Sequence, residues 1–136
     1  MQELSRLIGA YATAVDGRDL EALRVLFFPD AVLTVRWGEG EPQVFRGHEG
    51  LAGVIEAVSP FELTLHEVSS PVFEVGPGGK EATGESVCIA HQVRDGGDLV
   101  LYGRYSDTYR RSDGEWRFAT RELRVLWTEK RSVRLV

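Results

Sequence analysis

The chain has 136 residues, of which 43% are hydrophobic and 27% are charged, and its formal net charge is −5. This length and hydrophobic content predict one domain, residues 1–136, with a sizeable core. Basic and acidic residues are interspersed and the balance is acidic, which argues against a nucleic-acid partner. Cys88 is the single cysteine, so no disulfide can form within the chain, and we expect a cytoplasmic protein.

Residues 2–16 carry apolar side chains at helical spacing and predict an amphipathic helix, with Gly17 as its C-terminal cap. The same segment includes Glu3 and Arg6 and has no long apolar run. We therefore expect no signal peptide. We also expect no membrane partner, because no stretch approaches the ~18 apolar residues of a membrane span.

Asp19 is a favourable N-cap residue and predicts a second helix over residues 20–27. A strand over residues 31–37 and a short return strand over residues 43–46 are expected next, because turn-forming residues separate two β-rich runs. A short helix over residues 51–58 completes the first half of the chain.

The second half of the chain predicts four long strands, separated by turns that contain glycine. Asp113 and Gly114 join the last two strands, and this dipeptide is a strong hairpin signal. Helices followed by an antiparallel meander indicate an α+β fold with helices packed on one face of a curved sheet. The expected strands span residues 62–75, 81–94, 98–112 and 115–128.

The order and spacing of several segments resemble the SnoaL-like branch of the nuclear transport factor 2-like superfamily. The resemblance extends over nearly the whole chain, from about Leu4 to Trp127. Each segment alone is a weak signal, but their order and spacing together are fairly specific for this fold. The segments that carry the resemblance are Tyr11, residues 14–20, residues 26–31, Gly47, His66, residues 103–110 and residues 113–117.

This resemblance implies a cone-shaped, curved mixed sheet wrapped around the N-terminal helices, with a deep pocket (a cystatin-like α+β barrel). The superfamily includes scytalone dehydratase, lindane dehydrochlorinase, ketosteroid isomerase and polyketide cyclases. Other members have no catalytic activity, so the fold alone does not settle the function. We expect a small hydrophobic ligand or substrate and no cofactor. We also expect a homodimer or other homo-oligomer, since the outer face of the sheet must be covered or polar.

Asp16 and His66 are the expected catalytic dyad. Neutral imidazole can abstract a proton near pH 7, and a carboxylate can hold its tautomer and stabilise the imidazolium. A spacing of 50 residues says nothing about contact, and each residue alone could be structural. The resemblance supplies the link, because scytalone dehydratase and lindane dehydrochlorinase pair an aspartate at the position of Asp16 with a histidine at that of His66.

Tyr105 and Asp107 share one face of their strand by alternation, and with Tyr11 they are expected to bind substrate. Ketosteroid isomerase, which resembles this chain here, has a protonated aspartate near Asp107 and a tyrosine matching Tyr11. Its general base would fall at Val35, which cannot accept a proton. The ketosteroid isomerase mechanism therefore does not carry over directly.

Arg121 is a third expected catalytic residue, since lindane dehydrochlorinase has an arginine that aligns with it. A guanidinium could bind an anion, stabilise an enolate or pair with Asp107. A simple two-residue turn at Asp113 and Gly114 would pair Asp107 with Thr120 and turn Arg121 to the opposite face. Only a bulge within residues 116–120 would turn both side chains inward, and both alternatives remain open at this point.

His91 is a possible substrate-binding or supporting group, although a slip of one residue would place it on the other face of its strand. Trp37 is expected in the core or the pocket wall. No metal site is expected, because the three histidines and one cysteine do not match a zinc spacing.

Two functions of different classes remain open. The first is a cofactor-independent lyase or isomerase, such as a dehydratase, a dehydrohalogenase or a polyketide-cyclase-like enzyme, with His66 as general base and Asp16 as its orienting group. The second is a non-catalytic small-molecule-binding or dimerisation module. A sizeable pocket with the dyad on its wall favours the first, and a pocket filled by side chains favours the second.

Overall fold

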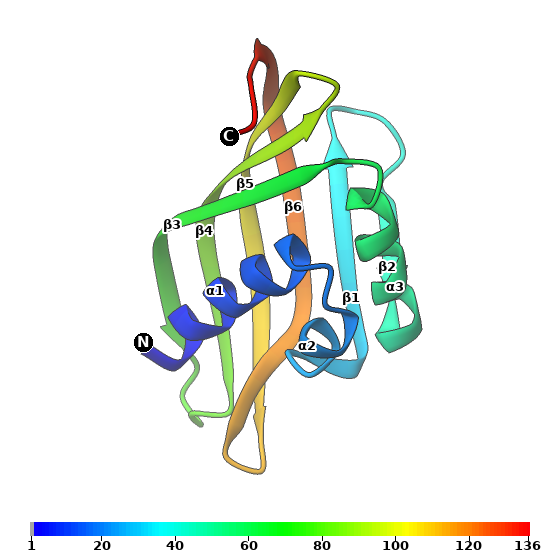
Figure 1. Cartoon of the computed structure of the whole chain (residues 1–136). Coiled ribbons are helices and arrows are strands. Elements are labelled where there is room, and N and C mark those ends of the chain that lie inside the picture. Colours follow the sequence, from blue (N-terminus) through cyan, green and yellow to red (C-terminus); the bar gives the residue numbers. More distant parts are fainter. Residues whose placement is uncertain (1) are drawn as a thin grey trace.

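In the computed structural model, which describes residues 2–136, helices cover one face of a strongly curved six-stranded sheet (Figure 1). The elements in chain order are α1 (Gln2–Asp16), α2 (Leu20–Arg24), β1 (Phe27–Trp37), β2 (Gln43–Arg46), α3 (Gly47–Val58), β3 (Leu63–Val75), β4 (Glu81–Arg94), β5 (Gly97–Ser112) and β6 (Glu115–Ser132). The expected α+β class with N-terminal helices is confirmed.

The strands are arranged in the order β2-β1-β6-β5-β4-β3, so β2 and β3 form the open edges of the sheet. Strands β3 to β6 form the predicted antiparallel meander, whereas β1 runs parallel to β6 and makes the sheet mixed. Within strand β3, Ser70 has a positive φ of 53°, and the register of the pairing with β4 shifts there. This irregularity accompanies the bend of β3 in Figure 1.

Helix α1 lies across the concave face of the sheet, and α2 and α3 lie beside β1 (Figure 1). The apolar stripe of α1 enters the core through Leu4, Ile8 and Tyr11, none of which is more than 5% exposed. No helix within residues 2–136 combines the length and the hydrophobicity that a membrane span requires.

Several predicted boundaries differ from the structure, and β1 begins at Phe27 rather than at residue 31. Helix α2 ends at Arg24 rather than at residue 27, because Phe27 already pairs with Phe118 of β6 and stacks on its ring at 4.8 Å. The sheet therefore overrides the local helical pattern. Helix α3 begins at Gly47, four residues earlier than predicted, and β6 continues to Ser132.

The left-handed residue at the end of α1 is Arg18, with φ 53°, and not Gly17. The backbone N–H of Asp19 donates to the Ala14 carbonyl, and that of Arg18 donates to the Val15 carbonyl. These two bonds form the Schellman pattern that closes many helices. Glycine usually occupies the left-handed position, so an arginine there needs another source of stability.

The register of β5 and β6 shifts between Thr108 and Tyr109, so that Ala119 is an extra residue in β6. As a result, Asp107 lies directly opposite Arg121, and both side chains point to the covered face. The bulge that the sequence left open within residues 116–120 is therefore present.

Candidate active site

A cavity of about 100 Å³ lies between the inner face of the sheet and helices α1 and α3. Its wall is mostly apolar, and residues from all six strands contribute to it. Apolar walls with a few convergent polar groups are typical of small-molecule sites. The polar side chains of the lining are Tyr11, Gln43, His66, Gln92 and Tyr105.

His66 and Asp16 are in direct contact at the wall of this cavity. The His66 Nδ1 lies 2.6 Å from the Asp16 Oδ1, and the His66 backbone N–H donates to the Asp16 Oδ2 at 2.8 Å. The two side chains are only 10% and 19% exposed. The structure therefore brings together two residues that the sequence separates by 50 positions.

Local structure explains how this contact arises. Asp16 is the last residue of α1, so its side chain emerges where the helix meets β3. His66 alternates with Thr64 on the inner face of β3, while Leu65 between them is 55% exposed on the outer face. Because an ionised carboxylate only accepts hydrogen bonds, the proton on the neutral His66 ring belongs on Nδ1. The other nitrogen, Nε2, is then a proton acceptor on a ring that lines the cavity.

The hydrogen bonds around Asp16 keep it ionised. Burial alone would raise its pKa, but the hydrogen bonds from the His66 ring, the His66 backbone and the Thr64 hydroxyl outweigh that effect. The pKa of Asp16 is therefore lowered below its ordinary value of 3.8. A stable negative charge at this place favours an imidazolium on His66 after the ring accepts a proton.

Two tyrosine side chains, Tyr11 and Tyr105, line the same cavity. Burial raises the pKa of Tyr11 to about 12 and raises that of Tyr105 well above its ordinary value. Both hydroxyls therefore stay protonated at neutral pH. Each can donate a hydrogen bond to an oxygen of a bound molecule, which is the role that an oxyanion needs.

Arg121 is buried behind these tyrosines and does not reach the cavity lining. Its guanidinium carbon lies 3.5 Å from the Tyr105 ring centroid and 4.3 Å from that of Tyr11, and its Nη1 donates to Asp107 at 2.9 Å. Of the three roles that the sequence left open for Arg121, the structure shows the pairing with Asp107, and it does not place the side chain at this cavity. Arg121 can influence a bound molecule only through the tyrosine rings on which it stacks.

Asp107 is also buried away from the cavity lining, so the structure does not bring this predicted substrate-binding residue to the cavity. Its Oδ2 accepts hydrogen bonds from Arg121 and from the Tyr109 hydroxyl. Burial raises the pKa of Asp107, and Arg121 opposes this shift. Three polar atoms of the pair, Oδ1 of Asp107 and Nε and Nη2 of Arg121, have no partner within residues 2–136.

Residues 1–122 match the family model of the SnoaL-like domain. The chain belongs to the SnoaL-like family. No curated protein sequence matches the chain.

Solved structures that this SnoaL-like domain resembles carry several different names. A candidate scytalone dehydratase from Novosphingobium aromaticivorans has 28% identity and a TM-score of 0.81, with 98% of this chain and 89% of that chain covered. A candidate aromatic ring hydroxylase from the same species has 25% identity and a TM-score of 0.82, with 96% and 92% covered. The hexachlorocyclohexane dehydrochlorinase LinA-type3 from Novosphingobium barchaimii has 20% identity and a TM-score of 0.83, with 99% and 92% covered. The fold similarity therefore does not choose one reaction.

His91 of the SnoaL-like domain lies on the outer face of β4, whereas Ala90 and Gln92 beside it line the cavity. Its Nδ1 contacts Asp98 at 2.7 Å and its Nε2 contacts Glu67 at 2.9 Å. The structure does not bring His91, predicted as a substrate-binding or supporting group, to this cavity, because alternation along the strand turns its side chain away.

Trp37 is part of the cavity lining at the end of β1, and it is 41% exposed. This position at the rim agrees with the predicted pocket wall. Sequence reasoning missed Gln43 and Gln92, because alternation alone cannot say which polar strand residue faces a cavity. Sequence reasoning also gave no role to Arg18 and Thr64, which contact the dyad.

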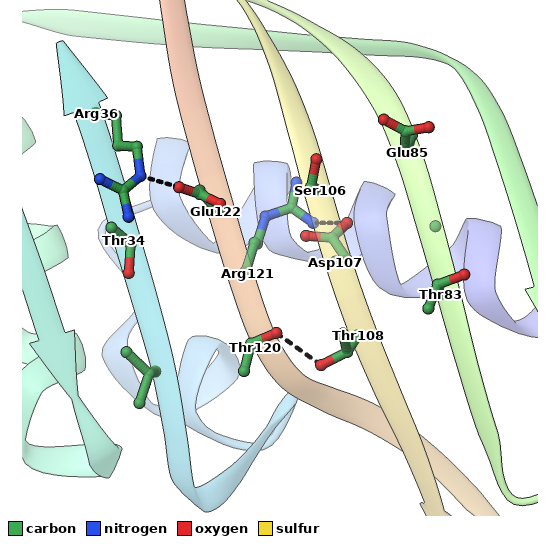
Figure 2. Close-up of a pocket in the computed structure, with 12 residues that line it drawn as sticks. Thr34, Arg36, Thr83, Glu85, Ser106, Asp107, Thr108, Thr120, Arg121 and Glu122 are labelled. Carbon is green, nitrogen blue, oxygen red and sulfur yellow. Dashed lines mark hydrogen bonds and ion pairs between the residues drawn. The ribbon is translucent and has the colours of Figure 1, made fainter. Parts of the chain in front are cut away.

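A larger hollow of about 470 Å³ lies on the outer face of the sheet, across β1, β6, β5 and β4 (Figure 2). Threonine and serine hydroxyls line it, and Figure 2 shows Arg36 paired with Glu122 and Thr108 in contact with Thr120. Its lining contains no histidine. The smaller inner cavity is the better candidate active site because His66, whose ring contacts Asp16, lies on its wall. Within residues 2–136, no three His, Cys, Asp or Glu side chains are grouped to hold a metal ion.

Proposed function

We propose that this SnoaL-like protein is a cofactor-independent lyase or isomerase that removes a proton from a small, neutral, mostly apolar molecule. The observation that carries the proposal is the 2.6 Å contact between His66 and Asp16 at the wall of an apolar cavity. The ionisable side chains of the cavity lining are those of His66, Tyr11 and Tyr105, and the lining contains no Asp, Glu, Lys or Arg. This composition favours an uncharged substrate.

In the proposed reaction, Nε2 of His66 accepts a proton from an acidic C–H bond of the substrate. Asp16 stabilises the resulting imidazolium through Nδ1. The electron pair of the broken C–H bond then forms a C=C bond. In an elimination it displaces a leaving group from the neighbouring carbon, and the His66 imidazolium returns its proton to a departing hydroxide, which leaves as water. In an isomerisation it forms an enolate, which the His66 imidazolium reprotonates at another carbon. Tyr11 and Tyr105 donate hydrogen bonds to the oxygen on which negative charge develops.

The comparisons support elimination as the first reaction class to test. The similar structure from Novosphingobium aromaticivorans with 28% identity is described as a candidate dehydratase. Dehydration removes a proton and a hydroxyl group from adjacent carbons, which needs a base on one side and a hydrogen-bond donor on the other. His66 and the tyrosine hydroxyls can supply these two functions.

A second candidate, a non-catalytic small-molecule-binding module, is favoured by the size of the cavity. About 100 Å³ is below the ~300–1,000 Å³ of most ligand pockets, so side chains fill much of the space. A protein of this kind would bind a small ring without changing it.

The experiment that tests the proposal measures proton abstraction directly. The protein is incubated in D₂O with cyclohexanone, and deuterium at the α-carbon is measured by mass spectrometry. A cyclic β-hydroxy ketone is used in parallel, and its dehydration is followed by the ultraviolet absorbance of the enone. We expect His66→Gln to lower both rates by about 100-fold or more. We expect His91→Gln, the same change on the outer face, to leave them unchanged.

Equal rates for wild type and His66→Gln on both probes would overturn the catalytic proposal. Saturable binding of cyclohexanone without deuterium exchange or dehydration would support the binding module instead.

A further inference from the structure

Arg18 connects the end of α1 to the strand that carries His66. Its Nη1 donates to the Thr64 hydroxyl at 2.6 Å and to the Asp16 carbonyl at 3.1 Å. Its Nη2 donates to the carbonyls of Val58 at 2.9 Å and Phe61 at 3.1 Å. One guanidinium therefore joins the turn after α1, the end of α3 and the beginning of β3.

The backbone of Arg18 is in the left-handed region that non-glycine residues avoid, with φ 53°. Such a conformation persists when surrounding contacts over-determine it, and it points to a constraint on that residue. The hydrogen bonds of the Arg18 side chain supply this constraint. The left-handed backbone in turn directs the guanidinium toward Thr64.

The Thr64 hydroxyl relays this constraint to the dyad. A hydroxyl has one proton, and because Oγ1 of Thr64 accepts from the positively charged Arg18, its proton is left for the Asp16 Oδ1 at 2.9 Å. Thr64 is only 2% exposed, so water does not compete for this bond. Asp16 Oδ1 thus receives hydrogen bonds from both Thr64 and His66, and Oδ2 receives the His66 backbone N–H.

Three donors to one carboxylate fix its rotation about the Cβ–Cγ bond. A fixed carboxylate holds the His66 ring with Nδ1 toward Asp16 and leaves Nε2 as the unprotonated nitrogen on the cavity side. Without the Thr64 hydroxyl, Asp16 keeps only the two His66 donors and can tilt away from the ring plane.

We propose that Arg18 and Thr64 are positioning residues that select the Nδ1–H tautomer of His66 by fixing the Asp16 carboxylate. Through Val58, which lines the cavity, Arg18 also ties the end of α3 to the same network. The catalytic importance of this tautomer rests on the proposed function, but the tautomer selection itself does not.

The main test replaces Thr64 with valine, which has a similar shape but no hydroxyl, and with serine, which restores the hydroxyl. The ¹⁵N chemical shifts of the His66 ring report the tautomer when the ring is neutral. We expect a single Nδ1–H tautomer in wild type and Thr64→Ser, and at least a fivefold increase of the minor tautomer in Thr64→Val. A wild-type tautomer ratio in Thr64→Val overturns the proposal.

Arg18→Lys is the second variant, and it keeps the positive charge without the two-armed guanidinium. We expect it to increase the minor tautomer as Thr64→Val does, because one ammonium cannot hold Thr64 and the α3 carbonyls together. If Thr64→Val does not fold, Arg18→Lys decides the question, and a wild-type tautomer ratio in it overturns the proposal. If Arg18 and Thr64 only stabilise the fold, both variants should have lower thermal stability and an unchanged tautomer ratio.

The activity readout separates this inference from the proposed function. If wild type exchanges deuterium into cyclohexanone, Thr64→Val should lower kcat about tenfold with KM unchanged within about twofold, and Thr64→Ser should restore the rate. If wild type has no activity, the proposed function fails while the tautomer measurement still tests the positioning.

Discussion

The carboxylate of Asp107 and the guanidinium of Arg121 lie 2.9 Å apart between β5 and β6, because Ala119 adds one residue to β6. Without that residue, alternation would place the two side chains on opposite faces of the sheet. The pair is almost fully buried, with side-chain exposures of 1% and 0%. The Arg121 guanidinium of this pair lies against the rings of Tyr11 and Tyr105, which line the cavity.

The first prediction concerns this buried pair. Asp107→Leu leaves the Arg121 charge buried without a partner, and we expect it to lower the free energy of unfolding by about 3–5 kcal/mol. The double variant Asp107→Leu/Arg121→Met should recover most of that loss, because it also removes the buried charge. Urea denaturation measures both effects.

The control for this prediction is Arg117→Met in the same strand, which removes the exposed ion pair with Glu115. We expect it to cost less than about 1 kcal/mol. A double variant that is no more stable than Asp107→Leu alone would show that the pair is not the source of the loss.

The main elements of this fold could be predicted from the sequence because their signals are local. The periodicity of α1 and the Asp113–Gly114 turn depend on neighbours along the chain, and the structure agrees with both. The end of α2 could not be predicted, since Phe27 is drawn into the sheet by Phe118, a residue about 90 positions away.

The candidate site also depends on contacts between residues that are distant in the sequence, which local patterns could not predict. Alternation could not decide between the two registers of β5 and β6, because one bulge residue, Ala119, reverses the faces. The resemblance to known proteins supplied the pairing of Asp16 with His66, which local pattern could not. The contacts of Arg18 were invisible in the sequence, since they combine a left-handed backbone with carbonyls of α3 and β3.

The second prediction compares two Gly→Ala changes. A Cβ on Gly103 would lie 2.4 Å from the Arg124 carbonyl oxygen, so the backbone of β6 has to shift. We expect Gly103→Ala to lower the free energy of unfolding by about 1–3 kcal/mol. Gly103 therefore serves the close approach of β6.

Gly9→Ala is the matched comparison, because a Cβ on Gly9 meets nothing within 4 Å on α1. Alanine favours the helix, and we expect a gain of about 0.5–1 kcal/mol. Thermal denaturation of the two variants gives opposite shifts of Tm if the geometry is right, and shifts of the same sign would contradict it.

The third prediction is a pH dependence of stability from His91. Burial works against its charged form, but hydrogen bonds to Asp98 and Glu67 outweigh this and raise the pKa of His91 above its ordinary value of 6.5. A raised folded-state pKa stabilises the folded protein fully below the unfolded-state value. This contribution is lost as the pH rises through the folded-state pKa.

His91→Gln should therefore reduce Tm most below pH 6.5, and the difference from wild type should shrink at higher pH. Glu67→Gln, which removes only the more exposed partner, should produce a smaller change of the same sign. A difference in Tm that stays constant across this pH range would show that His91 stabilises the fold by packing alone.

The fourth prediction tests which hollow of the molecule holds a ligand. Ala90 is 1% exposed and lines the inner cavity of about 100 Å³. Leucine at this position would fill much of that space and leave no room for a ligand. We therefore expect Ala90→Leu to abolish binding of cyclohexanone. Binding is measured through the change in tryptophan fluorescence, to which Trp37 of the cavity lining contributes beside Trp116 and Trp127. Ala10→Leu, on a half-exposed position of α1 outside the cavity lining, should bind as wild type does. If Ala90→Leu binds cyclohexanone with unchanged affinity, the ligand occupies another place, and the hydroxyl-lined hollow of the outer face becomes the site to examine.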